Sequence, residues 1–356
     1  MKHSCLRNTQ DDENKWIGSQ SFTRQLVNLL TCHSSLATYF RIKDNLLLAL
    51  VCSISLFISA CSDKHCVELP EVSENAVNFI VANDLGRNGY YDQKPIAQIM
   101  AYTAEHLDIE MIAAAGDVHH FEGVASVDDP LWMTNYELIY DHPELMIDWY
   151  AVCGNHEYRG NTQAVLDYAH VSRRWNAPSR YYTRAITAND GVSCRLVFID
   201  TTPLMDKYRN DTLTYPDACK QDAILQLHWI DSVLTHSSEK WKIVIGHHPV
   251  YAETKKEESE RTDLQARLAP ILEKNHVDAY FCGHIHNFQH IQLPSSTVNY
   301  VVNSAGSLAR PVKAIEGTQF CSGDPGFTLC SVDTSAFRFF FINQKGKTIY
   351  RYSIMR

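Results

Sequence analysis

Five short segments of the chain place Asp, Asn or His close to glycine, and each directly follows a short apolar run. Their side chains offer carboxylate and carboxamide oxygens and imidazole nitrogens, a mixture that suits divalent or trivalent first-row metals. One such segment carries little information, but five in order are hard to explain as satisfied polar residues at strand ends. The segments are N-D-L-G at 83–86, G-D-V-H-H at 116–120, G-N-H-E at 154–157, G-H-H-P at 246–249 and G-H-I-H at 283–286.

The apolar runs that precede these segments predict buried strands, because uninterrupted apolar runs of this length suit strands covered on both faces. Helical patterns lie between the runs, and alternating residues near the C-terminus predict antiparallel strands. The predicted buried strands are 77–82, 111–115, 149–153, 196–199, 243–245, 279–282 and 300–302, and the predicted helices are 95–107, 162–168, 222–234 and 264–274. The predicted antiparallel strands are 327–332, 337–342 and 348–352.

Repeated strand-then-helix order with a strand-rich tail favours a layered α/β domain. In open α/β folds, ligands bind outside the carboxyl ends of the strands, which is where the five polar segments fall. The sequence therefore predicts one α/β domain with a metal site at the carboxyl ends of its strands.

Composition excludes several classes of protein. The 356 residues are 45% hydrophobic and 21% charged, which excludes wholesale disorder, collagen and a multi-span membrane protein. The formal net charge is −9. Such a chain lacks the basic footprint that nucleic-acid binding requires, so no nucleic-acid partner is expected.

The N-terminal region carries an uncharged apolar stretch at 46–60, of about 15 residues, followed by Cys61. It is shorter than the roughly 20 residues of a spanning helix, and with its small-residue junction it resembles a bacterial lipoprotein signal. An ordinary signal or a buried core segment are the alternatives. We expect 1–60 to be a leader with a lipoprotein-type signal, 61–74 a short tether and 75–356 the folded domain. The protein would be exported and lipid-anchored through Cys61, on the periplasmic side or the outer surface of the cell envelope.

An exported chain can form disulfides. Cys153 and Cys282 end strand-like runs and are predicted to be buried free thiols. Candidate bridges are Cys194 with Cys219 and Cys321 with Cys330, although sequence does not pair them.

The five segments together resemble the signature of the calcineurin-like metallophosphoesterases. More narrowly, the chain is similar to small purple acid phosphatases of the tartrate-resistant type. Further similarity lies in R-W-N-A-P-S at 174–179, F-I-D-T at 198–201 and C-G-H-I-H-N at 282–287, and the resemblance covers roughly 75–350. It implies a four-layer αββα sandwich.

The resemblance also implies a ligand set for two metal ions, drawn from Fe, Zn and Mn. Carried over by position, Asp84, Asp117, His120 and His286 would bind one metal, and Asn155, His247 and His284 the second, with Asp117 bridging both. A shared carboxylate holds two cations about 3.5–4 Å apart, as two-metal hydrolysis requires.

Two departures from the family pattern matter. The family has a tyrosinate at the position of His120, and its charge transfer to Fe(III) gives the colour. A neutral imidazole there should favour Fe(III) less and accept Fe(II), Zn or Mn more readily; the adjacent His119 is the alternative ligand, which spacing disfavours. The tartrate-resistant enzyme also carries a substrate-facing His in the loop after His247. This chain has Lys255 and Lys256 there, in a charged run at 253–261 that is most simply a solvated loop.

The resemblance implies a dinuclear-metal phosphatase that hydrolyses phosphate monoesters of small phosphorylated substrates. A metal-activated hydroxide would attack phosphorus, and His156, beside Asn155, would protonate the leaving group. Asn155 and His156 would thus also contact substrate. The alternatives are a phosphodiesterase or protein phosphatase on the same site, or a surface lipoprotein that binds phosphorylated ligands without turnover. We expect His248 to be a packed residue, and His142, His228, His276 and His290 to be structural or on the surface.

Overall fold

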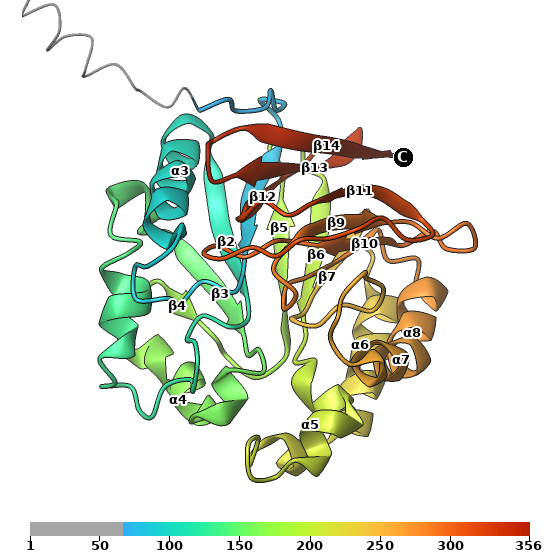
Figure 1. Ribbon diagram of the computed structural model, residues 1–356. Helices are drawn as coiled ribbons and strands as arrows, with labels where there is room; N and C mark the ends of the chain where they lie inside the picture. Colours follow the sequence, from blue (N-terminus) through green and yellow to red (C-terminus); the bar gives the residue numbers. More distant parts are fainter. Residues whose placement is uncertain (1–66) are drawn as a thin grey trace, which may run out of the picture. The chain divides into compact units, whose positions relative to one another are not determined.

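The computed structural model describes residues 67–356; Cys61 and the predicted signal segment lie outside the described residues. Two seven-stranded sheets make up its centre (Figure 1). The first sheet has the order β14 (Thr348–Met355), β13 (Ala336–Asn343), β12 (Gly326–Val332), β1 (Val77–Ala82), β2 (Ile109–Ala115), β3 (Asp148–Val152) and β4 (Trp175–Asn176). The second has the order β11 (Thr318–Ser322), β9 (Phe288–Ile291), β10 (Asn299–Val302), β8 (Ala279–Cys282), β7 (Trp241–Ile245), β6 (Ser193–Phe198) and β5 (Tyr182–Thr187).

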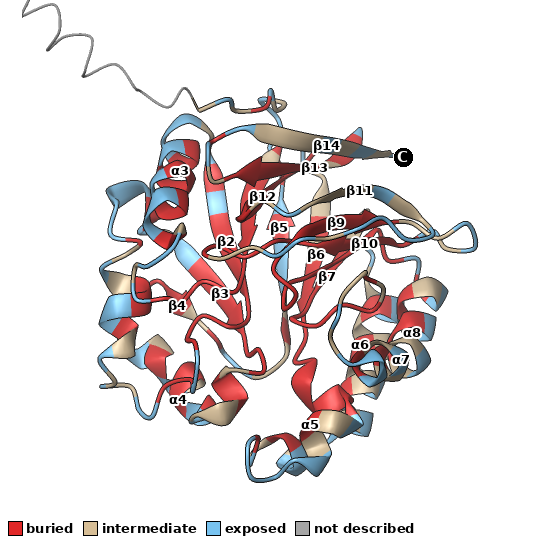
Figure 2. Cartoon of the chain, viewed as in Figure 1, coloured by how far each residue is buried: buried red, intermediate tan, exposed pale blue. Residues whose placement is uncertain are grey.

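The two sheets pack face to face, with helices on their outer faces. Alternation along β1 shows the reason: Phe79 and Val81 belong to the core between the sheets, and Ile80 belongs to the core beneath the helices. The helices are α3 (Gln93–His106), α4 (Thr162–Asp167), α5 (Asp206–Asn210), α6 (Ala223–His236), α7 (Glu258–Arg267) and α8 (Ala269–Lys274). Figure 2 shows their inner sides buried and their outer sides exposed. The predicted four-layer αββα sandwich is confirmed.

Parallel pairing brings the polar segments to one edge of each sheet. In the first sheet β1, β2 and β3 run parallel, and in the second β7 runs parallel to β8. The five segments are the loops that leave these strands at their carboxyl ends. A hydrogen bond from His247 Nδ1 to the carbonyl of Ala115 joins the two edges, at 2.9 Å.

Most predicted elements are present, and the differences have local causes. The predicted helix at 264–274 is two helices, because Pro270 in the first turn of α8 lacks an amide and clashes with the preceding turn. In α6 the buried residues are Gln226, Ile230 and Leu234, whereas Ile224 is exposed. Strands β4, β5, β9 and β11 were not predicted, because their residues do not form a clear apolar run.

The candidate disulfides are wrong: Cys194, Cys219, Cys321 and Cys330 are all free. Cys321 lies on β11 and Cys330 on β12, which belong to different sheets. Cys153 and Cys282, the two predicted free thiols, are buried and free as expected.

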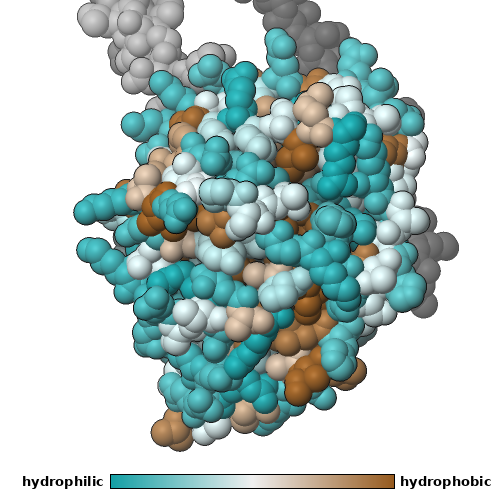
Figure 3. Space-filling model, turned by 90° about the vertical axis from the view of Figure 1, so that its right-hand side faces the viewer, coloured by the Kyte–Doolittle hydropathy of each residue, from teal (hydrophilic) through white to brown (hydrophobic). Residues whose placement is uncertain are grey.

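The first described residues, 67–72, pack against the rest of the domain. Val67, Leu69 and Val72, within the predicted tether, pack against the core, and the amide of Glu68 donates to the carbonyl of Gly346 at 2.7 Å. Within 67–356, no helix combines the length and the apolar character needed to cross a membrane. The face in Figure 3 is mainly hydrophilic, with scattered hydrophobic side chains.

Candidate dinuclear metal centre

Four candidate ligands sit on strained backbone just after their strands. The φ angles are +51° at Asp84, +53° at Asp117, +73° at His284 and +61° at His286. Residues other than glycine rarely adopt this left-handed region, and such strain gathers at functional sites. The loops also approach one another very closely: a Cβ on Gly154 would lie 2.3 Å from Asp117 Oδ1, so only glycine fits there.

Asp84, His120 and His286 form one cluster of buried groups able to hold a metal. The Nε2 atoms of His286 and His120 lie 3.1 and 3.9 Å from Asp84 Oδ1. The Nδ1 atoms of the two rings donate to backbone carbonyls, of Leu308 for His286 and of Gly86 for His120. Those bonds fix the tautomers and leave each Nε2 free to coordinate.

Asp117 lies between this cluster and the second half of the centre. Its Oδ2 is 3.6 Å from Nε2 of His120 and 3.1 Å from Nε2 of His247. One carboxylate oxygen thus faces histidines of both predicted metal sites, which is what a bridging ligand must do. Asn155 comes from the adjacent loop, and its side chain is buried.

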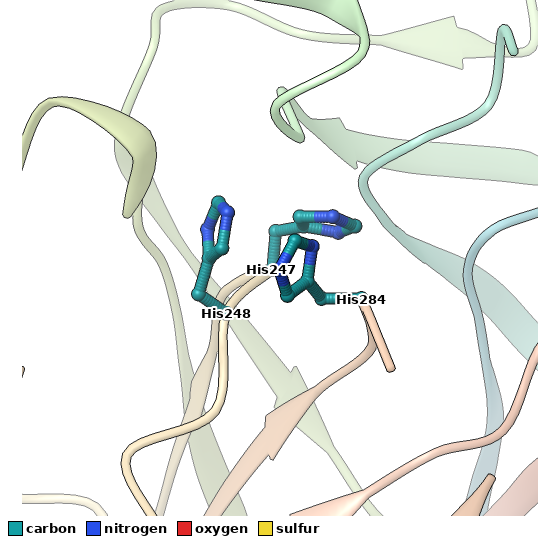
Figure 4. Close-up of side chains that lie close together, drawn as sticks. All are labelled: His247, His248 and His284. Atoms are coloured by element: carbon teal, nitrogen blue, oxygen red, sulfur yellow. The ribbon is translucent and has the colours of Figure 1, made fainter. Parts of the chain in front are cut away.

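His284 completes the second half with the opposite ring orientation. Its ring centroid is 5.2 Å from that of His247 (Figure 4). Its Nε2 donates to Glu260 at 3.0 Å, which leaves Nδ1 as the coordinating atom. Nζ of Lys256 lies 3.5 Å from that Nδ1.

Buried polar atoms without hydrogen-bond partners test whether this donor set fits two metals. Within residues 67–356, such atoms include Asp84 Oδ1, His120 Nε2, Asn155 Oδ1 and His247 Nε2. Burying unpaired polar atoms is costly, so the unpaired atoms on four predicted ligands fit metal coordination. The residues present therefore fit the expected dinuclear centre.

Two neighbours of the predicted ligands play other parts. The ring of His119 packs edge-on against Trp132, with centroids 4.3 Å apart, and lies outside the clusters able to hold a metal. His248 sits beside His284 in Figure 4, but both its nitrogens are hydrogen-bonded, to Thr201 Oγ1 at 2.8 Å and to Tyr208 OH at 3.1 Å. It is a packed residue, as expected.

The carboxylates are held ionised. Burial would raise the pKa of Asp84, but attraction to His286 outweighs it, so the pKa falls below its usual range. Burial likewise opposes ionisation of Asp117, and attraction to His247 and His156 lowers its pKa. Both groups thus carry the negative charge that cation binding needs.

The pKa values of the three histidines His120, His284 and His247 differ because their neighbours differ. Burial lowers the pKa of His120 to about 3. Burial and repulsion from Lys256 lower the pKa of His284 to about 3. Burial acts the same way on His247, but attraction to Asp117 outweighs it and raises the pKa to about 9. His120 and His284 are therefore neutral at pH 7, whereas His247 must release a proton in order to coordinate.

Sequence reasoning missed two buried acids behind the ligands. Glu157, the last residue of G-N-H-E, accepts three backbone N–H bonds, from Asp117, His119 and Gly154, at 2.7–3.0 Å. Glu157 therefore joins two of the loops that carry predicted ligands. Its position in the G-N-H-E segment could have indicated this role from the sequence. Burial, with repulsion from Asp117, raises its pKa to about 7.

The second missed acid is Glu260. The run at 253–261 was expected to be a solvated loop, but it enters α7, and Glu260 is buried there. Lys207 Nζ and Tyr208 OH donate to its Oε1 at 2.8 and 2.9 Å, while His284 donates to Oε2. The contact between Glu260 and His284 depends on tertiary packing. The sequence therefore contains no local pattern that predicts it.

The predicted general acid lies at the edge of the centre. His156 Nδ1 donates to the carbonyl of Phe121 at 2.5 Å, and its Nε2 lies 3.8 Å from Asp117 Oδ2. Its side chain is 13% exposed, whereas the predicted ligand side chains Asp117 and His247 are 2% and 0% exposed. Substrate could therefore reach it from solvent.

Comparison with known proteins agrees with this centre. The profile of the calcineurin-like phosphoesterase family matches residues 61–288. Purple acid phosphatase 4 of Arabidopsis thaliana is 31% identical, over 78% of this chain and 84% of its own length. Purple acid phosphatase 3 of the same plant is 32% identical, over 80% and 79%.

The chain belongs to the purple acid phosphatases, within the calcineurin-like phosphoesterase family. Human tartrate-resistant acid phosphatase type 5 is 27% identical, over 81% of this chain and 94% of its own length. A dinuclear centre of Fe, Zn or Mn is the cofactor of this family, and the His and Asp clusters can hold it.

Solved structures show the same fold. GAP50, described as the anchor in the inner membrane complex of Plasmodium, superposes with a TM-score of 0.68 at 20% identity, over 79% of this chain and 89% of its own. A purple acid phosphatase from yellow lupin superposes with a TM-score of 0.55 at 15% identity, over 80% of this chain and 54% of its own. These likenesses concern the fold alone.

Proposed function

We propose that this purple acid phosphatase relative hydrolyses phosphate monoesters at the dinuclear centre. The observation that carries the proposal is a set of seven buried candidate ligands, Asp117 among them, with His156 beside Asp117. Two bound metals would activate water as the nucleophile and neutralise charge on the phosphate. The seven ligands are Asp84, Asp117, His120, Asn155, His247, His284 and His286.

His156 serves as the proton donor to the leaving group. Its Nδ1 proton is committed to the Phe121 carbonyl, so Nε2 carries a proton only in the imidazolium form. Burial lowers the pKa of His156 despite attraction to Asp117. The acid form therefore builds up below the usual pKa of about 6.5, which favours catalysis at acidic pH.

Cationic side chains around the centre support an anionic substrate. Nζ of Lys256 lies 3.5 Å from His284 Nδ1, and the lining of a hollow of about 370 Å³ beside it includes three cations, Lys255, Lys256 and Arg310, and one carboxylate, Glu253. Within 67–356 none of these three cations lies within 4.0 Å of a carboxylate oxygen. In a chain of net charge −9, this local excess of positive charge favours entry of phosphate esters.

One assay separates this function from its alternatives. Protein loaded with Zn, Mn or Fe is expected to hydrolyse p-nitrophenyl phosphate faster than bis-p-nitrophenyl phosphate. Faster diester turnover would identify a phosphodiesterase. Tight phosphate binding without turnover would identify a binding protein.

We propose in addition that the protein is exported and lipid-anchored at the cell envelope through Cys61. The support is the apolar stretch at 46–60, which Cys61 directly follows. Two acyl chains hold a protein at a membrane stably where one does not. Replacing Cys61 with Ser should release the protein from the membrane fraction, and an intact N-terminus upstream of Cys61 in purified protein would contradict the anchor.

A further inference from the structure

A second hollow, of about 490 Å³, opens directly beside the metal centre. Its wall includes the candidate ligand His120 and the adjacent Phe121. His156 lies at the same border: its ring centroid is 4.3 Å from that of His120, and its Nδ1 donates to the Phe121 carbonyl. A leaving group that takes a proton from His156 would therefore lie next to this hollow.

Large aromatic side chains line the hollow. Tyr90, Tyr91 and Phe121 are 72%, 63% and 62% exposed, and all three belong to its wall. Exposing three large aromatic rings in one place is unfavourable unless they meet a partner. The guanidinium of Arg87 lies over the ring of Phe121, 4.7 Å from its centroid, and holds that ring in place.

The loop that carries the two tyrosines is rigidly held. Asn88 and Tyr91 have φ of +53° and +56°, which strains residues other than glycine, and Gly89 has φ of +76°. The side chain of Gln93 accepts from the amides of Arg87 and Gly89 at 3.0 and 2.8 Å. A further bond joins the amide of Asn88 to Asn135 Oδ1 at 2.7 Å. Such a loop fixes the backbone that carries the two tyrosines before any ligand arrives, which reduces the entropy cost of binding.

We propose that this hollow is the leaving-group site and that its aromatic lining selects phosphate esters of phenols. The inference rests on the proposed phosphatase function, because it places the phosphate on the adjoining centre. An aromatic ring bonded to the ester oxygen would begin beside His156 and extend between Tyr90, Tyr91 and Phe121. Contacts between aromatic rings contribute about 0.5–1.5 kcal/mol beyond area burial. Aryl ligands should thus bind roughly 3- to 10-fold more tightly than saturated ligands of the same size.

Phosphonates test this without the complication of leaving-group acidity, since their P–C bond is not hydrolysed. Calorimetry on the metal-loaded protein, at an acidic pH where both ligands are monoanions, would compare phenylphosphonate with cyclohexylphosphonate, which have similar volume. We expect phenylphosphonate to bind about 3- to 10-fold more tightly. Tyr90→Leu and Tyr91→Leu should reduce this ratio toward one while the affinity for cyclohexylphosphonate stays the same. The corresponding Tyr→Phe variants should retain the ratio.

Tyr102→Leu is the matched control, because Tyr102 is a surface aromatic on α3 that stacks on His106 and lies outside the hollow. Equal affinity of the wild type for both phosphonates would overturn the aryl site, as would a loss of both ligands together in the tyrosine variants. Turnover of p-nitrophenyl phosphate and glycerol 2-phosphate separates the two proposals. Hydrolysis of both with equal phosphonate affinities refutes only the aryl site, whereas no hydrolysis of any monoester refutes the phosphatase function.

Discussion

Oδ2 of Asp117 lies 3.1 Å from Nε2 of His247, and this contact joins the edges of the two sheets at the metal centre. Asp117 leaves β2 in the first sheet, and His247 leaves β7 in the second. Nε2 of His120 lies 3.6 Å from the same oxygen. The carboxylate of Asp117 is therefore the meeting point of both predicted metal sites.

Replacement of Asp117 should remove both metals. We expect Asp117→Ala to abolish phosphatase activity, because each metal would lose its shared ligand. Elemental analysis would measure metal per chain, with the exposed Asp128 replaced by Ala as control. Two metals retained in Asp117→Ala would refute the bridging assignment.

The His247–Asp117 pair should make the stability of the metal-free protein depend on pH. The pKa of His247 is raised to about 9 in the folded protein from 6.5. The folded state therefore binds more protons between these values, so the pair stabilises fully below pH 6.5 and is lost as pH rises through 9. We expect a loss of about 3 kcal/mol across that range. Urea unfolding of chelator-treated protein would measure it, and His247→Gln should flatten the profile.

His156→Ala should leave the metals bound and slow turnover according to the leaving group. General acid catalysis is typically worth about 10²–10⁴-fold, and nitrophenolate departs with little protonation. The loss in kcat should therefore be large for alkyl phosphates and small for p-nitrophenyl phosphate. The exposed His170, replaced by Ala, is the control. Equal losses on both substrates would remove His156 from the acid role.

Glu260→Gln should weaken metal binding without removing a ligand. The carboxylate orients the ring of His284 through a 3.0 Å hydrogen bond, and loss of such a partner typically costs about 10- to 100-fold in metal affinity. Glu258→Gln on the exposed side of α7 is the matched control. Titration with Zn would measure both variants, and unchanged affinity in Glu260→Gln would show that Glu260 only packs.

The protein should lack the purple colour of its family. Imidazole at His120 cannot supply the phenolate-to-Fe(III) transition, so the oxidised iron form should show no broad visible band. His120→Tyr should create that band if the side chain at 120 binds iron. A coloured wild-type protein would mean that another tyrosine reaches the iron, and the first metal site would need a different ligand.

The sequence by itself determined the buried strands and the positions of the candidate metal ligands directly after them. Apolar runs predicted β1 and β8 over 77–82 and 279–282, since a strand buried on both faces has little tolerance for polar residues. The position of Asp84 and Asp117 directly after strands predicted that they would meet, because parallel strands end at a common edge. The identities of these ligands were thus readable from local order.

Tertiary structure decided what short-range patterns do not encode. Whether His119 or His120 faces the carboxylates depends on Trp132, which packs against the ring of His119. The burial of Glu260 depends on where α7 docks relative to the loop that carries His284. The disulfide predictions failed for the same reason, since spacing along the chain does not tell which sheet a cysteine joins. Distances between segments far apart in sequence follow from the packing of two whole sheets, and no single stretch of residues specifies that packing.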